Sequence, residues 1–320
     1  MKEHGIPRWA TPAPATGGAV MATGIVSVGF RLTGFTVLSA VTLVLAGALW
    51  LFLAAGFATL LAVDRRSWLG RAATPPALTA VAATDVLGVR LDLLGWTAVA
   101  AALLVLATAA WAVLLPAVLH RLGRRVPGAA FLICVATESL AVLAAVLTPQ
   151  AGDWLGWAAL VLFLLGLALY ADALARFDVR QLAVGAGDHW VAGGATAICA
   201  LAGSKLLASG VWSGAAHSVL RTTTFVLLAV SLGWYLVLLG FEVARPRLRY
   251  DLRRWSTVFP LGMTAVAALS TAAAAQVPWL DTLGRVLLWI AAAAWLLTAC
   301  GAARRLARTT GAARLTGERV

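Results

Sequence analysis

Three ionisable residues lie inside long apolar stretches of the sequence, where a charged side chain is costly and is a functional candidate by default. Glu138 lies near the middle of one stretch, and Asp85 and Lys205 lie within two others. Glu138 could carry a proton, or it could be a buried carboxylate bonded to neighbouring Thr or Lys. Asp85 and Lys205 could form an ion pair, or Lys205 could supply positive potential that attracts anions. These residue types indicate movement of ions or protons.

The stretch from Trp255 to Gln276 combines an apolar composition with residues that bend or polarise a helix. Pro260 removes one backbone hydrogen bond and bends the helix axis, and Gly262 follows it closely. Thr264 adds a hydroxyl that a purely lipid-facing helix does not need. Because a freed carbonyl within a membrane must be satisfied by protein or by water, we expect this stretch to face the inside of a helix bundle.

The sequence carries no signature of a metal site or of an enzyme. Cys134, Cys199 and Cys300 each lie in a different apolar run, and no CxxC or Cys/His spacing is present. The four histidines are scattered, and no nucleophile–base arrangement is visible. We therefore expect no metal, no cofactor and no catalysis, and we interpret the cysteines as small packing residues.

The composition excludes a soluble globular domain. Hydrophobic residues make up 62% of the 320 residues and charged residues only 12%, with a mean hydropathy of +0.91. Soluble domains have about 25% charged residues. The net charge of +12 comes from short basic clusters between apolar runs. We interpret these clusters as topology signals beside membrane lipid and not as a nucleic-acid-binding surface.

The apolar runs predict an all-α integral membrane protein with ten transmembrane helices. A span needs about 20 apolar residues, and the sequence contains ten such segments. They are residues 15–34, 36–63, 74–92, 93–118, 127–148, 153–175, 188–209, 217–242, 255–276 and 281–303. The predicted organisation is a short N-terminal tail (1–14), a single transmembrane domain (15–303) and a basic C-terminal tail (304–320).

The basic residues predict the orientation in the membrane. If the N-terminus is cytoplasmic, 20 of the 25 Lys and Arg residues fall in inner loops and tails. The positive-inside rule then predicts two cytoplasmic termini, and we expect the protein in the cell inner (plasma) membrane. We expect the arginines of 245–254 and 304–319 to act as orientation signals and contacts to anionic lipid. Arg31 and Arg90, near the outer ends of their segments, could snorkel or form a basic vestibule that concentrates anions.

The odd-numbered and even-numbered segments differ in chemistry. The odd segments hold most of the polar and glycine residues, whereas the even ones are long and rich in Leu, Ala and Val. This contrast predicts five helical hairpins, with the odd helices in an inner pore ring and the even helices outside. Candidates for lining the pore or coupling transport are Gly24, Asp85, Glu138, Lys205 and Thr264.

Three stretches carry a family resemblance: GGAVMATGIVSVGF (17–30), DHWVAGGATAICALAG (188–203) and RRWSTVFPLGMTAVA (253–267). They resemble the tellurite-resistance/C4-dicarboxylate transporter family, which includes the slow-type anion channels of plant guard cells and their bacterial homologues. The resemblance implies five hairpins around a central pore and a homotrimer with one pore per subunit. It also implies that a phenylalanine on the ninth helix occludes the pore, and the motif assigns this role to Phe259, beside Pro260.

The expected function is therefore passage of small inorganic or organic anions through a phenylalanine-occluded pore. A bare carboxylate in that pore would repel an anion, so Glu138 must be protonated, paired or turned away. Close relatives are expected to carry Gln at this position. Glu138 therefore leaves open a proton-coupled secondary carrier for tellurite, sulfite or C4-dicarboxylates such as malate.

Overall fold

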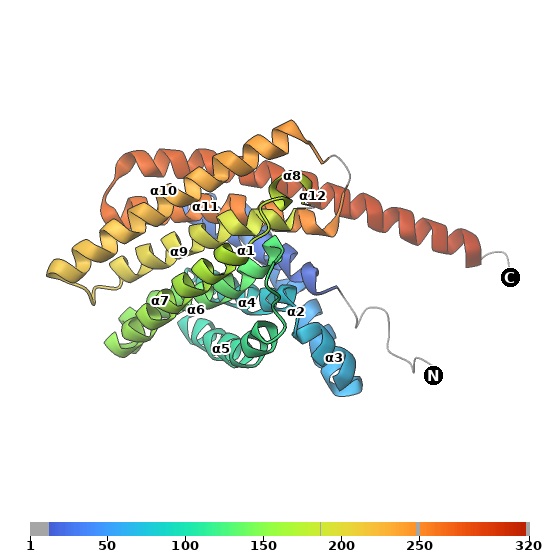
Figure 1. Ribbon diagram of the computed structural model, residues 1–320, viewed down its shortest axis with the longest axis horizontal. Helices are drawn as coiled ribbons and strands as arrows, with labels where there is room; N and C mark the ends of the chain where they lie inside the picture. Colours follow the sequence, from blue (N-terminus) through green and yellow to red (C-terminus); the bar gives the residue numbers. More distant parts are fainter. Residues whose placement is uncertain (1–12, 186, 248–249, 318–320) are drawn as a thin grey trace.

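The computed structural model describes residues 13–185, 187–247 and 250–317, which fold almost entirely into helices (Figure 1). Within these ranges no β-strand occurs, and one isolated bridge joins Val126 to Phe177. The all-α class predicted from the sequence is confirmed. The α-helices are α1 (Gly17–Leu32), α2 (Thr36–Val63), α3 (Arg65–Ala72), α4 (Thr79–Asp92), α5 (Thr97–Leu119), α6 (Leu132–Ala151), α7 (Asp153–Arg176), α8 (Gln181–Val184), α9 (Val191–Ala208), α10 (Gly214–Ala244), α11 (Trp255–Ala275) and α12 (Pro278–Gly317).

Most of these helices are long enough to cross a membrane. Eight helices of the described ranges pass on length and apolarity, and a ninth is counted if α3 and α4, bent by 92° at their junction, form one broken span. α1 is shorter, with 16 residues, or about 24 Å at 1.5 Å per residue. The hydrocarbon core of a bilayer is about 30 Å thick. The protein is thus a multi-pass membrane protein, and each predicted apolar segment contains a helix.

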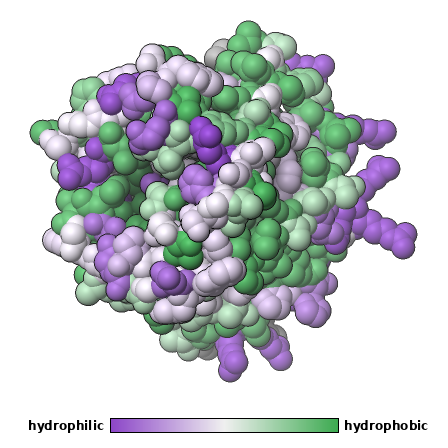
Figure 2. Space-filling model, turned by 90° about the vertical axis from the view of Figure 1, so that its left-hand side faces the viewer, coloured by the Kyte–Doolittle hydropathy of each residue, from purple (hydrophilic) through white to green (hydrophobic). Residues whose placement is uncertain are grey.

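The helices fall into two classes by burial. Over their apolar windows, the spans containing α6, α9 and α11 are 89–94% buried, whereas α2, α5, α7, α10 and α12 are only 17–28% buried. α1 and α4 are also mostly buried. The exposed helices carry most of the large apolar side chains on the surface. Figure 2 shows much hydrophobic surface, with hydrophilic residues scattered over the end that faces the viewer and projecting at the right-hand edge.

The five buried helices contact one another in a closed order. α1 packs against α4, α4 against α6, α6 against α9, α9 against α11, and α11 against α1. Each buried helix also packs against the exposed helix that follows it, namely α2, α5, α7, α10 or α12. In Figure 1 the α9–α10 turn lies at the left-hand end, and α12 projects from the bundle at the other end.

Small residues allow these helices to approach closely, as is common in membranes. A Cβ added at Gly88 of α4 would lie 2.6 Å from Leu143 Cδ2 of α6. One added at Gly203 of α9 would lie 2.4 Å from Thr224 Oγ1 of α10. Glycines at these two contacts therefore set the distance between the helix pairs.

Two segments differ from the sequence prediction. Residues 65–72 form α3 where a basic loop was expected, because the Asp64 side chain caps the helix by accepting a 3.0 Å hydrogen bond from Ser67 N. α12 continues to Gly317, through the predicted tail. Hydropathy falls after residue 303, but the Ala, Leu and Arg found there are strong helix formers. Residues 1–12 and 318–320 of the predicted tails lie outside the described residues.

Candidate functional site

A small cavity lies at the centre of the five buried helices, each of which contributes side chains to it. Its volume is about 20 Å³, roughly the space needed by one water molecule. Asp85, Ser139 and Lys205 are its polar lining residues. The rest of the cavity lining is apolar and includes at least one side chain from each helix, among them Ile25, Val86, Val142, Ile198 and Met263. We call the line through this cavity, between the five helices, the axis.

Asp85 and Lys205 face this cavity from different helices. Asp85 is 1% exposed, and its Oδ2 accepts a 2.6 Å hydrogen bond from Ser139 Oγ. Its other oxygen, Oδ1, is buried and has no hydrogen-bond partner among the described residues. Lys205 lines the cavity from α9, yet it does not appear among the ion pairs of the described chain, which join nitrogen and oxygen within 4.0 Å. The structure brings these two predicted residues together without pairing them directly.

A second hollow, which we call the vestibule, is formed by the N-terminal ends of the same five helices and the turns that precede them. Its volume is about 190 Å³, and its lining includes Asp188, Arg253, Ser256 and Phe259. Helix N-termini carry partial positive charge, and five of them converge here. Their backbone dipoles and the Arg253 guanidinium favour an anion, whereas Asp188 opposes it.

Phe259 and Met21 form one layer of the vestibule lining. Both line the vestibule, and both are at most 2% exposed. One helical turn further along, Met263 on α11 and Ile25 on α1 line the cavity. Because residues four apart share a helix face, the Phe259–Met21 layer lies one helical turn from the residues that line the central cavity. Met21 was not among the sequence candidates, although its spacing of four from Ile25 places both on one face.

The other candidates near the proline face neighbouring helices. A Cβ at Gly194 would lie 2.8 Å from Pro260 Cγ, so the proline ring packs against α9. A Cβ at Gly262 would lie 2.8 Å from Ile25 Cγ2 of α1. Thr264 Oγ1 donates to Pro260 O at 2.9 Å and lies 3.4 Å from Ser231 Oγ of α10. These residues shape the helix around Phe259, and the described linings of the two hollows do not include them.

Gly24 has a packing position. A Cβ added there would lie 2.7 Å from Val86 Cγ1, which faces the central cavity from α4. Gly24 therefore brings α1 close to α4 and sets the position of a lining side chain. Gly24 therefore affects the shape of the central cavity indirectly, through Val86.

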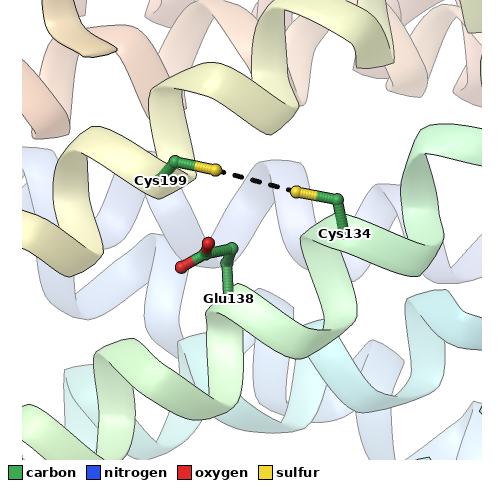
Figure 3. A group of neighbouring side chains, drawn as sticks. All are labelled: Cys134, Glu138 and Cys199. Carbon is green, nitrogen blue, oxygen red and sulfur yellow. Dashed lines mark hydrogen bonds between the residues drawn. The ribbon is translucent and has the colours of Figure 1, made fainter. Parts of the chain in front are cut away.

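Glu138 points away from the axis. It lies in a cluster with Cys134 of α6 and Cys199 of α9, one atom of each side chain lying within 4.8 Å of the others. Figure 3 shows the three side chains converging in the gap between the two helices. On its other side the Glu138 carboxylate lies against Gly166 of α7, where an added Cβ would be 2.4 Å from Oε1. The sequence held one signal of this grouping, since Cys134 and Glu138 are four residues apart.

Arg90 is buried and does not snorkel to a membrane surface. It is 2% exposed, and its Nε donates hydrogen bonds to Ser39 Oγ at 2.9 Å and Ser27 Oγ at 3.2 Å. These serines also donate to each other's carbonyl oxygens, at 2.6 and 2.7 Å. Arg90 thereby joins α4 to the α1–α2 hairpin, whereas Arg31 is exposed.

Replacing Ser39 with Ala is expected to destabilise the protein. The change removes one acceptor from a buried guanidinium and the hydrogen bond to Ser27 O, so we expect a loss of about 1–3 kcal/mol. Thermal unfolding in detergent measures this effect. Ser218→Ala is the matched control, because Ser218 is exposed and, within the described part of the chain, its hydroxyl donates only a 3.3 Å hydrogen bond to Gly214 O of its own helix. Equal melting temperatures for the two variants would contradict the role of the network.

The basic segment after α10 contains specific ion pairs. Arg254 Nη1 lies 2.7 Å from Glu242 Oε1, and Arg247 also pairs with Glu242. Arg253 Nε lies 3.1 Å from Asp251 Oδ1. These hydrogen bonds from Arg253 hold the pKa of the Asp251 carboxyl below its usual value. Part of the cluster predicted to contact lipid therefore fixes the entry to α11.

Comparison with known proteins agrees with this architecture. Residues 13–303 match the SLAC1 family, described as voltage-dependent anion channels, which is a description of a transport protein and not of an enzyme. Among curated proteins, the uncharacterized membrane proteins Rv1735c and MT1776 of two Mycobacterium tuberculosis strains are each 35% identical over 136 residues. The alignment covers 38% of this chain and 66% of each relative, slightly under two thirds of their length. The family match spans nearly all of the helical bundle, and the chain belongs to the family of voltage-dependent anion channels.

Proposed function

We propose that this protein conducts small anions across a membrane along the axis of α1, α4, α6, α9 and α11. The observation that carries the proposal is the arrangement of two hollows on one axis with the Phe259–Met21 layer between them. In this conformation the path is closed, because the layer is buried and the central cavity has room for about one water. Opening then requires the Phe259 ring to move.

Positive groups along the axis can attract anions, whereas Asp188 in the vestibule and Asp85 in the central cavity oppose them when ionised. Five helix N-termini and Arg253 surround the vestibule, and Lys205 lines the central cavity. The remaining wall of the cavity is largely aliphatic, so it offers a permeating ion little hydration. A dry constriction of this kind gates by excluding ions, and fixed positive charge lowers the barrier for anions relative to cations.

We further propose ten spans with both termini in the cytoplasm. α1, preceded by a 3-10 turn at Pro14–Thr16, would supply the tenth span, and the five hairpins would form an inner and an outer ring. The basic segments at 64–71, 120–127 and 244–254 lie on the side of the vestibule under this topology, which the positive-inside rule assigns to the cytoplasm of a plasma membrane. The predicted domain boundaries, at residues 14 and 303, belong to this proposal.

A proton-coupled carrier is the second candidate, and Asp85 is the observation that favours it. Asp85 is a buried carboxylate on the axis with one oxygen free of hydrogen bonds from the described residues. In a carrier of tellurite, sulfite or a C4-dicarboxylate, its proton would move with the substrate. The coupling residue would then be Asp85, since Glu138 points away from the axis.

Anion flux from proteoliposomes distinguishes these functions. A channel is expected to release chloride or nitrate at a rate that rises linearly with concentration and needs no pH gradient. A carrier is expected to saturate and to respond to an imposed pH gradient. Absence of flux above that of empty liposomes, for inorganic anions and malate alike, would contradict both.

We also propose that the protein assembles as a homotrimer in the membrane, with lipid around it. The support is the family resemblance, together with the apolar side chains exposed on the outer helices, which can contact either lipid or a second copy. Native mass spectrometry from detergent is expected to give the trimer mass. A monomer at every protein and detergent concentration would contradict this assembly.

A further inference from the structure

Two cysteines and a glutamate that are far apart in sequence meet inside the bundle, away from the axis (Figure 3). The Cys134 and Cys199 sulfurs lie 3.7 Å apart, and the Glu138 carboxylate lies within 4.8 Å of both. All three residues have exposed fractions of 0%. The cluster joins α6 to α9, two of the five buried helices.

The carboxylate of Glu138 lies beside the Cys199 thiol but has no hydrogen bond of normal geometry to the described residues. Neither Oε1 nor Oε2 accepts a hydrogen bond from the residues that the structure describes. Buried polar groups are nearly always satisfied, and an exception calls for a specific explanation such as an ion. The absence of a side chain at Gly166 leaves the space that this carboxylate fills.

We propose that Cys134, Glu138 and Cys199 form a binding site for Zn²⁺. A tetrahedral zinc with Zn–S distances of about 2.3 Å and Zn–O distances of about 2.1 Å holds two sulfurs about 3.8 Å apart and a sulfur and an oxygen about 3.6 Å apart. The observed sulfur separation of 3.7 Å already matches the first distance. A small side-chain rotation brings the carboxylate to the second.

Both Glu138 oxygens can take part. A bidentate carboxylate fills the remaining coordination position, so the site closes without an external ligand and accounts for both unpartnered oxygens. Two thiolates, one carboxylate and Zn²⁺ leave a net charge of −1. This is smaller than the charge of −2 on a four-cysteine structural zinc site. A closed site between two helices has a structural role, which here is to hold α6 against α9.

The metal content of the purified protein tests the site. Because all three ligands are buried, exchange is expected to be slow, so Zn²⁺ or Co²⁺ is supplied during expression and the protein is purified in detergent. We expect one ion per chain in the wild type, and a thiolate-to-Co²⁺ charge-transfer absorption in the cobalt form. Cys134→Ser and Cys199→Ser are expected to lose the ion and the absorption. Glu138→Gln is expected to keep the sulfur absorption but to release the ion faster to a chelator.

Two further variants control for misfolding and for the third cysteine. Cys300→Ser removes an exposed cysteine outside the cluster and is expected to retain the full metal content. Gly166→Ala keeps all three ligands but places a Cβ against the Glu138 carboxylate, so faster release of the ion is expected. Size-exclusion profiles identify variants that fold.

Two results would overturn the proposal. One is a wild-type metal content no higher than that of the folded Cys134→Ser/Cys199→Ser variant. The other is an intact mass and thiol count that show a Cys134–Cys199 disulfide in freshly purified protein. Neither result depends on transport, so the zinc site and the proposed function are tested separately.

Discussion

Phe259→Ala is expected to increase anion flux through the reconstituted protein by about tenfold or more, which corresponds to a barrier lower by about 1.4 kcal/mol. The ring is 2% exposed and fills the layer between the vestibule and the central cavity. Removing it joins the two hollows and lets water follow the ion across the constriction. Chloride or nitrate release from liposomes, normalised to protein content, measures the change.

A second phenylalanine provides the matched control for this experiment. Phe163 on α7 is also 2% exposed, but it lies on an outer helix and is absent from the described linings of both hollows. Replacing a buried Phe with Ala destabilises a protein by about 3–5 kcal/mol. Phe163→Ala should therefore lower the melting temperature without raising flux. Equal flux from wild type, Phe259→Ala and Phe163→Ala would contradict the gate.

The helices could be predicted from the sequence because membrane-length apolar runs have few alternative structures. The contrast between polar, glycine-containing segments and Leu-rich segments also anticipated which helices are buried. The position of Phe259 followed from the family resemblance. The sequence did not show which way its side chain points. The structure does, because Phe259 lines the vestibule and Met263, one helical turn later, lines the central cavity.

The rotation of each helix about its own axis could not be predicted in the same way. Glu138 was a candidate for the pore because it lies mid-segment, yet a helix with polar residues on several sides gives no single inward face. On α6 the adjacent residue Ser139 faces the cavity, and Glu138 faces α7 and α9. Arg90 shows the same limit, since its partners Ser27 and Ser39 come from other helices.

The sequence position of a residue near the proline also did not show whether its side chain lines a hollow or packs against a neighbouring helix. Phe259 and Pro260 are adjacent in sequence, but one faces the vestibule and the other faces Gly194 of α9. A helix turns by about 100° per residue, so adjacent residues generally face different neighbours. Identifying the lining residues required the positions of all five helices.

The charges on the axis lead to the second large expected effect. Lys205→Ala is expected to reduce anion flux by up to about a hundredfold, since an anion passing about 6 Å from the ammonium at an effective dielectric constant of about 20 gains about 3 kcal/mol. Asp85→Asn removes from the same cavity a carboxyl group that repels anions when ionised, so a channel should conduct anions faster. Arg221→Ala is the control, because Arg221 is an exposed cation on α10 whose guanidinium lies 5.5 Å from the Phe225 ring.

The pair of axial variants also separates channel from carrier. In a carrier whose proton moves on Asp85, Asp85→Asn should abolish uptake driven by a pH gradient, because the amide cannot take up and release the proton. In a channel the same change raises flux and leaves it independent of the pH gradient. Flux unchanged in both Lys205→Ala and Asp85→Asn would mean that the ion does not pass through the central cavity. Because the two side chains share the cavity without a direct ion pair among the described residues, replacing either one breaks no salt bridge to the other.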